Sequence, residues 1–304
     1  MIDPQPDFTP APGVADPLEP GVRRILAPNP SPMTFRGTNT YLVGTRGIAV
    51  IDPGPDDSGH LDRILAALEP GQHVSHIFVT HAHLDHSPLA RPLAARTGAP
   101  ILGFGPATAG RSQVMHRLAS QGLVGGGEGV DHAFTPDVLV ADEQSVDGDG
   151  WSLKAVHTPG HMANHLSFAL GDVLFSGDLV MGWATSLVSP PDGDLTDFMT
   201  SLRRLQSRPW RRFHPGHGAP IDTPEARLSD LLAHRLGRER AILTALESGP
   251  ATAASLAARI YTQTPTALLP AAERNVLSHL IDLTSKNSVT PIGELSAESV
   301  FSLR

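Results

Sequence analysis

The segment from Thr80 to His86 constrains this chain more than any other part of its sequence. It reads Thr-His-Ala-His-Leu-Asp-His, so three imidazoles and one carboxylate fall within six positions. Both kinds of group ligate divalent metals. The apolar run Ile77-Phe78-Val79 before it predicts a short buried strand, and Ser87-Pro88-Leu89 after it predicts the start of a helix. We therefore expect a loop at a strand end, where a rigid scaffold can direct side chains to one point.

Three further candidate ligands also follow predicted strand ends. His161 and His217 each come directly after a Pro-Gly pair. Asp178 follows the second arm of a hairpin that we predict over residues 166–176. A carboxylate at the end of a buried strand is costly unless its charge is paired or bound to a metal. The sequence thus places these groups where they can complete a site begun by the first cluster.

The seven candidate ligands divide into two sets and a bridge. One set is His81, His83 and His161, the other is Asp85, His86 and His217, and Asp178 can bridge them. The chain contains no cysteine, so zinc would have to use His and carboxylate ligands. Two Zn²⁺ are the expected cofactors, and the same ligands also suit Mn²⁺ or Fe. Two such ions about 3.5–4 Å apart would hold a bridging hydroxide for attack on a carbonyl carbon or a phosphorus.

Strand and helix patterns alternate over residues 37–102, which predicts an α/β layer structure. A hairpin is expected over residues 37–54, and Asp52 lies near its end. Asp52 either accepts hydrogen bonds that orient ligand imidazoles or forms a turn before Pro53. Residues 138–141 and 153–156 are expected to be strands on either side of an Asp/Gly-rich turn at residues 147–150.

With 304 residues the chain is expected to hold two domains. Six prolines prevent a helix in residues 1–22, which we predict to be an extended N-terminal arm. The catalytic domain is expected over residues 23–222. Residues 226–304 predict three helices followed by strand-like residues, as in a winged helix. Their eight basic and seven acidic residues do not make a groove-binding face, so we expect this module to pack on the catalytic domain.

Residues 103–136 carry a weaker pattern. Five glycines between Gly122 and Gly129 predict a loop, and His116 and His132 are expected to lie on the surface. The formal net charge of −8 argues against a protein that coats nucleic acid. Neither a membrane-spanning apolar run nor a signal peptide is apparent, so a cytoplasmic location without a membrane partner is expected. The oligomeric state is open, a homodimer included.

The motif His-Ala-His-Leu-Asp-His resembles the HxHxDH signature of the metallo-β-lactamase fold. Asp52, His161, Asp178 and His217 match the other four motifs of that superfamily in order. Residues 35–44 and 215–218 look like the lactamase-beta-like branch, whose human mitochondrial member is a single-stranded-RNA endonuclease. Residues 260–275 are similar to the small winged-helix domain of that branch. The resemblance implies a four-layer αββα fold, two zinc ions and hydrolysis.

The chain departs from that branch at Asn164, where the branch usually has Asp. Asp85 and His165 are the candidates for a direct catalytic role, with His165 as an acid or a substrate contact. The alternative for His165 is a structural hydrogen bond. Asn164 and Trp183 are candidates for the substrate pocket, and a core position is the alternative for Trp183.

Three functions follow from these features. The first expectation is hydrolysis of a phosphodiester such as single-stranded RNA, from the branch resemblance. The second is hydrolysis of a small ester or thioester, as in glyoxalase II or lactonases, which the acidic charge and the lack of an aromatic stacking surface favour. The third, from another class, is a nucleic-acid-binding regulator that acts through the C-terminal module. A small molecule or a single-stranded nucleic acid is therefore the expected substrate.

Overall fold

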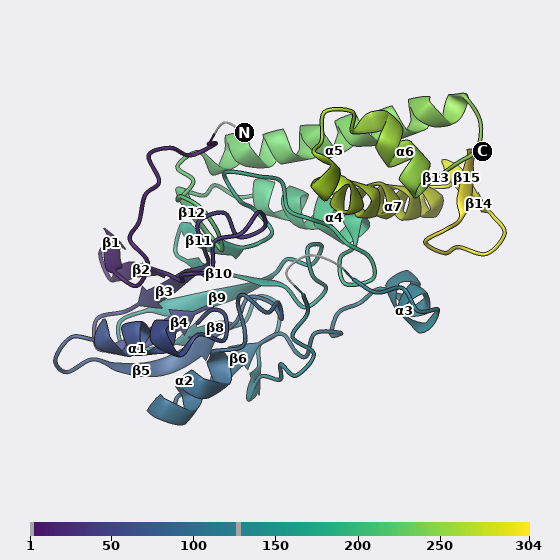
Figure 1. The fold of residues 1–304 in the computed structure, drawn as a ribbon. Coiled ribbons are helices and arrows are strands. Elements are labelled where there is room, and N and C mark those ends of the chain that lie inside the picture. The colour runs from purple at the N-terminus through teal and green to yellow at the C-terminus, as the bar shows by residue number, and fades with distance from the viewer. Residues whose placement is uncertain (1–2, 126–128) are drawn as a thin grey trace.

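The computed structural model describes residues 3–125 and 129–304 (Figure 1). The first half of the chain forms β1 (Ala15–Glu19), β2 (Val22–Leu26), β3 (Asn39–Val43), β4 (Gly47–Ile51), α1 (Ser58–Ala66), β5 (His73–Phe78), α2 (Ala90–Thr97), β6 (Ile101–Gly103), α3 (Gln113–Ser120) and β7 (Val138–Leu139). The second half begins with β8 (Ser145–Asp147), β9 (Ser152–His157), β10 (Leu166–Leu170), β11 (Val173–Gly177), α4 (Leu195–Gln206), β12 (Arg212–Pro215) and α5 (Pro224–Glu247). It ends with β13 (Ala251–Thr252), α6 (Ala253–Ile260), the 3₁₀ turn η1 (Thr266–Leu268), α7 (Leu269–Ser285), β14 (Val289–Ile292) and β15 (Val300–Leu303).

Strands β1 to β7 form one mixed sheet in sequence order. The predicted hairpin is confirmed, because β3 and β4 pair antiparallel with Tyr41 opposite Ile51. From β4 onward the neighbours are parallel, which requires the crossover helices α1 and α2. Within the segment predicted as an extended arm, β1 pairs with β2 at the edge of this sheet.

A second sheet has the order β12-β11-β10-β9-β8. The predicted hairpin at residues 166–176 is confirmed as β10 and β11. The Asp/Gly-rich turn, however, joins β8 to β9, whereas residues 138–139 form β7 and pair with β6 in the first sheet. The prediction did not include β8, a three-residue strand. Across that turn β8 pairs antiparallel with β9. The strand before β8 is β7, which pairs parallel with β6 in the first sheet.

Three apolar clusters divide the catalytic part into four layers. Phe78 from the first sheet packs with Phe168 and Phe175 from the second, so the two sheets face each other. The outer face of the first sheet packs against α1 and α2. The outer face of the second packs against α4 and the first half of α5. The predicted αββα order is confirmed, and Figure 1 shows these layers stacked from α5 down to α2.

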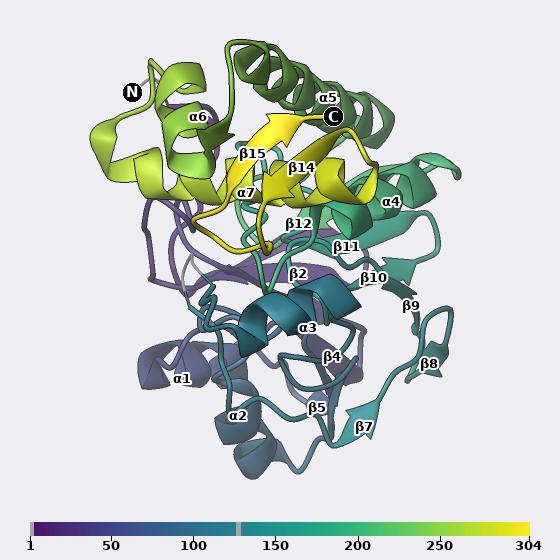
Figure 2. The same ribbon diagram turned by 90° about the vertical axis from the view of Figure 1, so that its right-hand side faces the viewer.

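The C-terminal helices and the β13-β15-β14 sheet share a separate apolar core. Ile242 and Leu246 join it from the second half of α5, so one continuous helix contributes to both cores. Met115 and Leu118 of α3 also pack into it, and Figure 2 shows α3 beside this module. The predicted winged-helix module is confirmed, and α3, which lies in the 103–136 segment, packs against it. In residues 3–125 and 129–304 no helix has the length and apolarity that a membrane crossing needs.

The buried imidazole of His279 in α7 should make the fold sensitive to acid. Neither of its ring nitrogens has a hydrogen-bond partner among the described residues, and burial, with Arg235 nearby, lowers its pKa to about 3. In the unfolded chain the pKa is about 6.5. The unfolded state therefore binds the extra proton first, and stability falls as the pH drops below about 6.5. This residue should cost on the order of 3 kcal/mol by pH 4.

The measurement is urea unfolding of metal-free wild-type protein and His279→Leu from pH 7 to pH 4. We expect the variant to gain stability relative to the wild type as the pH falls, because leucine takes up no proton. Two curves that stay parallel over that range would contradict the assignment.

Candidate metal centre

Loops that follow four strands bring the predicted ligands together at one edge of the sandwich. β5 leads into the segment from His81 to His86, and β9 leads to His161. β11 ends next to Asp178, and β12 delivers His217. All seven predicted ligand side chains are buried. Their donor atoms fall into clusters in which every atom lies within 4.8 Å of the others.

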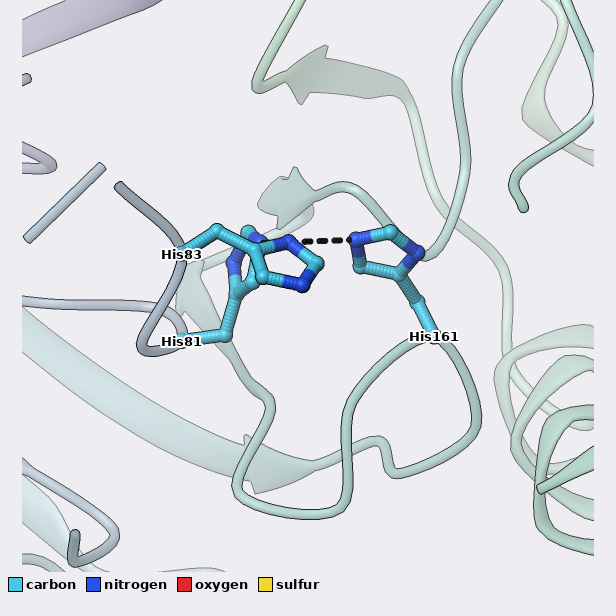
Figure 3. Close-up of side chains that lie close together, drawn as sticks. All are labelled: His81, His83 and His161. Carbon is cyan, nitrogen blue, oxygen red and sulfur yellow. Dashed lines mark hydrogen bonds between the residues drawn. The ribbon is translucent and has the colours of Figure 1, made fainter. Parts of the chain in front are cut away.

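The first cluster consists of His81, His83 and His161. Nε2 of His81 and Nε2 of His161 each lie 3.0 Å from Nδ1 of His83. Figure 3 shows the three rings converging from two different loops. Burial, together with the neighbouring imidazole of His161, lowers the pKa of His83 to about 3. A neutral ring leaves a nitrogen lone pair available for a metal ion.

The second cluster consists of Asp85, His86 and His217. Oδ2 of Asp85 lies 3.3 Å from Nε2 of His86 and 3.1 Å from Nε2 of His217. Asp178 lies between the clusters, with Oδ1 3.5 Å from His86 Nε2 and Oδ2 3.3 Å from His217 Nε2. The same Oδ2 atom is 3.7 Å from His161 Nε2 in the first cluster. Asp178 therefore faces both sets of ligands.

Outward hydrogen bonds fix the orientation of the ligand rings. Nδ1 of His161 donates to the Leu187 carbonyl at 2.7 Å, and Nδ1 of His217 donates to the Gly37 carbonyl at 3.1 Å. Since Nδ1 carries the proton that makes this bond, the neutral form of each ring presents the Nε2 lone pair to the centre. Such hydrogen bonds select the tautomer in many protein metal sites.

Asp52 organises the other side of the centre. Its Oδ2 atom accepts from His86 Nδ1 at 2.9 Å and from Thr80 Oγ1 at 2.7 Å. Thr80 Oγ1 in turn accepts from Nδ1 of His81 at 2.9 Å. The backbone of Asp52 has φ of 50°, a left-handed conformation that Asp tolerates better than most residues. Asp52 thus occupies a turn and orients two imidazoles, so its two predicted roles coexist.

The donor set fits divalent cations. Oδ1 of Asp178 is buried and has no hydrogen-bond partner among the described residues. A Cβ atom on Gly216 would lie 2.3 Å from that oxygen, so only glycine leaves the space beside it open. Burial opposes a charge on His217, but Asp178 and Asp85 outweigh burial and raise its pKa to about 10. The carboxylates thus require positive charge beside them, which bound cations would supply.

Two of the remaining predicted site residues are fully engaged elsewhere. His165 accepts from the Asp178 backbone N–H at 3.1 Å, and its Nδ1 lies 2.9 Å from Thr158 Oγ1. Both ring nitrogens are therefore used, which supports the structural alternative for His165 over the acid or substrate contact. Asn164 is buried and bonds to the Ala82 N–H and the Gly105 carbonyl. It does not line the pocket described below, so the structure gives it no place among substrate contacts.

A pocket of about 290 Å³ opens over the ligands. His83, Asp85, His161, Asp178 and His217 form its floor. Its walls are mostly apolar and include the predicted Trp183, and they are formed by Pro32, Met33, Met181, Trp183, Ala184, Thr185, Leu187, Tyr261, Thr264, Leu268, Ala271, Ala272 and Asn275. None of these described lining residues is Lys or Arg.

His116 and His132 are exposed, as predicted, and belong to none of the ligand clusters among the described residues. We expect His132→Ala to leave the metal content of the purified protein unchanged. Elemental analysis beside the wild type tests this, with His161→Ala as the variant that should lose metal. A missing ion in His132→Ala would mean that the 103–136 segment supplies a ligand.

Sequence reasoning missed the groups that orient the ligands and the walls contributed by the C-terminal module. Thr80 could have been noticed because it directly precedes His81. The Leu187 and Gly37 carbonyls had no signal, because any residue carries a backbone carbonyl. The module residues could not be found either, since they reach the pocket only through packing of α7 on the catalytic part.

Residues 33–217 match the family described as the metallo-beta-lactamase superfamily. The chain belongs to the metallo-β-lactamase superfamily. Residues 252–294 match the beta-lactamase associated winged helix domain. As a member of this superfamily the chain is a hydrolase, and its fold implies a divalent-metal site where the His/Asp clusters lie.

The similarity to known proteins extends over most of this chain. A beta-lactamase-like protein 2 homolog from Caenorhabditis elegans is 32% identical over 269 residues, or 85% of this chain and 82% of the relative. An atrochrysone carboxyl ACP thioesterase from Aspergillus fumigatus is 29% identical over 82% of this chain and 76% of its own. The crystal structure of a beta-lactamase domain protein from Burkholderia ambifaria has a TM-score of 0.81 at 21% identity, covering 99% of this chain and 96% of that one. This last likeness establishes the shared fold.

Proposed function

We propose that this chain hydrolyses esters or thioesters with two metal ions held at the candidate metal centre. The observation that carries the proposal is the pocket above the ligands, whose walls are mostly apolar and whose described lining residues include no Lys or Arg. A neutral carbonyl substrate with an apolar acyl group suits such a pocket. The similarity to an ACP thioesterase supports the same substrate class.

Hydrolysis of single-stranded RNA, the first expectation from the sequence, is less well supported. Proteins that bind single strands line their groove with cationic side chains along the phosphates and with aromatic rings for the bases. The described pocket offers two aromatic side chains, Trp183 and Tyr261, and no Lys or Arg. Trp183 stacks on Phe35 with ring centroids 5.0 Å apart, so one of its faces is already covered.

A nucleic-acid-binding regulator is also poorly supported. The helix that would enter a groove is α7, and residues 276–283 of this helix are all buried. A helix whose side chains are buried in its own module and against the catalytic part cannot present them to base edges.

The residues of the chain would divide the work as follows. His81, His83 and His161 would hold one metal, Asp85, His86 and His217 the other, and Asp178 both. Two Zn²⁺ are the proposed pair, with Mn²⁺ or Fe as alternatives; when bound, they would supply a water nucleophile at neutral pH and offset charge on the carbonyl oxygen. Asp52 and Thr80 keep the rings of His86 and His81 oriented. His165 holds the Asp178 backbone in place.

A hydrolysis panel on zinc-loaded protein tests this function. The substrates are an N-acetylcysteamine thioester, S-lactoylglutathione, a lactone, a β-lactam, a phosphodiester ester and single-stranded RNA. We expect turnover of a thioester or an ester, and its loss after chelation with recovery when zinc is returned. Cleavage of RNA without turnover of any ester or thioester would contradict the proposal. Elemental analysis of protein purified without added metal would identify the bound ions.

A further inference from the structure

One wall of the pocket comes from the C-terminal module. The side chains that form it lie in the turn after α6, in η1 and in α7. We call this set the acyl wall, and it consists of Tyr261, Thr264, Leu268, Ala271, Ala272 and Asn275. The opposite side is apolar too, with Met33, Met181 and Leu187. A substrate bound at the metal ligands must therefore pass between the catalytic part and the module.

Hydrogen bonds hold the acyl wall rigidly over the site. The buried guanidinium of Arg235 in α5 donates to Asn275 Oδ1 at 3.0 Å and to the Ser186 carbonyl. Asn275 Oδ1 also accepts from the Val188 N–H at 3.4 Å. Residues 186–188 belong to the loop whose Leu187 carbonyl orients His161. The module is thus fixed against the loop that shapes the metal centre, and the wall is formed before any substrate arrives.

The size of the pocket limits what can lie against this wall. Its volume of about 290 Å³ is near the lower end for ligand sites. A pocket of this size suits a small or medium-sized acyl group. A polar arm such as the pantetheine part of a thioester would leave unpaired polar atoms against these walls, which is costly. An apolar chain would not.

We propose that the acyl wall binds the acyl group of the substrate and makes the C-terminal module the selectivity element of the enzyme. The ligand class is a medium-chain or single-ring acyl group. This inference rests on the proposed function. In hydrolysis, water adds to the thioester carbonyl carbon and the C–S bond breaks. The acyl group leaves as a carboxylate, while the thiol sulfur takes one proton and solvent takes the other. The polar thiol arm lies toward the mouth of the pocket.

The test compares octanoyl and acetyl thioesters of N-acetylcysteamine. Ala271 is half-buried in α7 and lines the pocket, so Ala271→Phe would fill the space for a longer acyl group. We expect the ratio of kcat/KM for octanoyl over acetyl to fall at least tenfold, because the methylene groups lose their apolar contacts. Leu268→Ala should shift the preference toward dodecanoyl. Ala258→Phe, on an exposed face of α6, is the matched control and should leave the ratio unchanged.

A second measurement separates this inference from the proposed function. Octanoate binding to the zinc-loaded protein is followed by calorimetry, with zinc content determined for each variant. Octanoate binding that is weakened in Ala271→Phe but not in Ala258→Phe would support the acyl wall even if no thioester were hydrolysed. Failure of the wild type to bind octanoate would overturn the inference. So would an unchanged octanoyl-to-acetyl ratio in Ala271→Phe that retains its zinc.

Discussion

Asp178→Ala is expected to lose metal and hydrolysis together. Its carboxylate faces both ligand clusters, with Oδ1 3.5 Å from His86 Nε2, and Oδ2 3.3 Å from His217 Nε2 and 3.7 Å from His161 Nε2. Without it the second cluster has one carboxylate left, and five imidazoles and that carboxylate would have to hold two cations with little opposing charge. A metal pair contributes several kcal/mol to transition-state stabilisation, so turnover should fall about 10³-fold or more. Elemental analysis and the hydrolysis rate are measured on the same preparation.

Asp172→Ala is the matched control for this experiment. Asp172 lies on the turn between β10 and β11, and its exposed carboxylate pairs with Arg211. Exposed ion pairs contribute little to stability, so this variant should retain metal and turnover. An Asp178→Ala protein that keeps two metal ions and full activity would show that the bridging assignment is wrong.

Arg235→Met is expected to destabilise the protein and to weaken metal binding, although Arg235 is not a candidate ligand. Its buried guanidinium binds the Ser186 carbonyl and Asn275, and it lies over the Phe198 ring with 4.9 Å to the centroid. Methionine would leave the buried Ser186 carbonyl without this donor, and Asn275 Oδ1 would keep only the longer bond from the Val188 N–H. Hydrogen bonds from charged groups contribute about 1.5–3 kcal/mol each, so the free energy of unfolding should fall by roughly 3 kcal/mol or more.

The same substitution should weaken metal binding, because the loop at residues 186–188 orients His161. Loss of a group that orients a ligand typically lowers metal affinity about 10–100-fold. Chelator competition measures this affinity, and urea unfolding of the metal-free protein measures stability. Arg240→Met is the control, since Arg240 is an exposed residue of the same helix. If Arg235→Met loses stability but binds metal as tightly as the wild type, the link between the module and His161 is absent.

The local sequence predicted the elements that carry the ligands. An apolar strand pattern followed by Pro-Gly-His, or by a His-rich turn, indicates where the strand ends and which side chain follows it. The hairpins β3–β4 and β10–β11 were predictable for the same reason, since their turns and strands lie within a few residues. Harder to predict was β8, whose three residues carry too short a pattern. The partner of β7 was equally hidden, because strand pairing between segments apart in sequence has no local signal.

His165 illustrates the limit most clearly. Its position beside the signature residues left two roles open, a structural hydrogen bond and a catalytic acid. Only the structure places Thr158 at one ring nitrogen and the Asp178 N–H at the other. A histidine near a metal motif can contact substrate only if packing leaves one of its ring nitrogens without a hydrogen-bond partner.

By itself, the sequence predicted the candidate metal ligands, the layered α/β architecture and the presence of a helical C-terminal module. These properties depend on side-chain chemistry and on short-range periodicity, which a linear chain carries. Tertiary structure alone decided which atoms orient the rings and what surrounds the substrate. The acceptor for His217 is the carbonyl of Gly37, 180 positions away. The acyl wall of the pocket comes from the C-terminal module. Every residue carries the same backbone carbonyl, so the sequence does not indicate which carbonyl accepts a given hydrogen bond. Packing brings distant segments together, so the residues that line the pocket are known only from the folded structure.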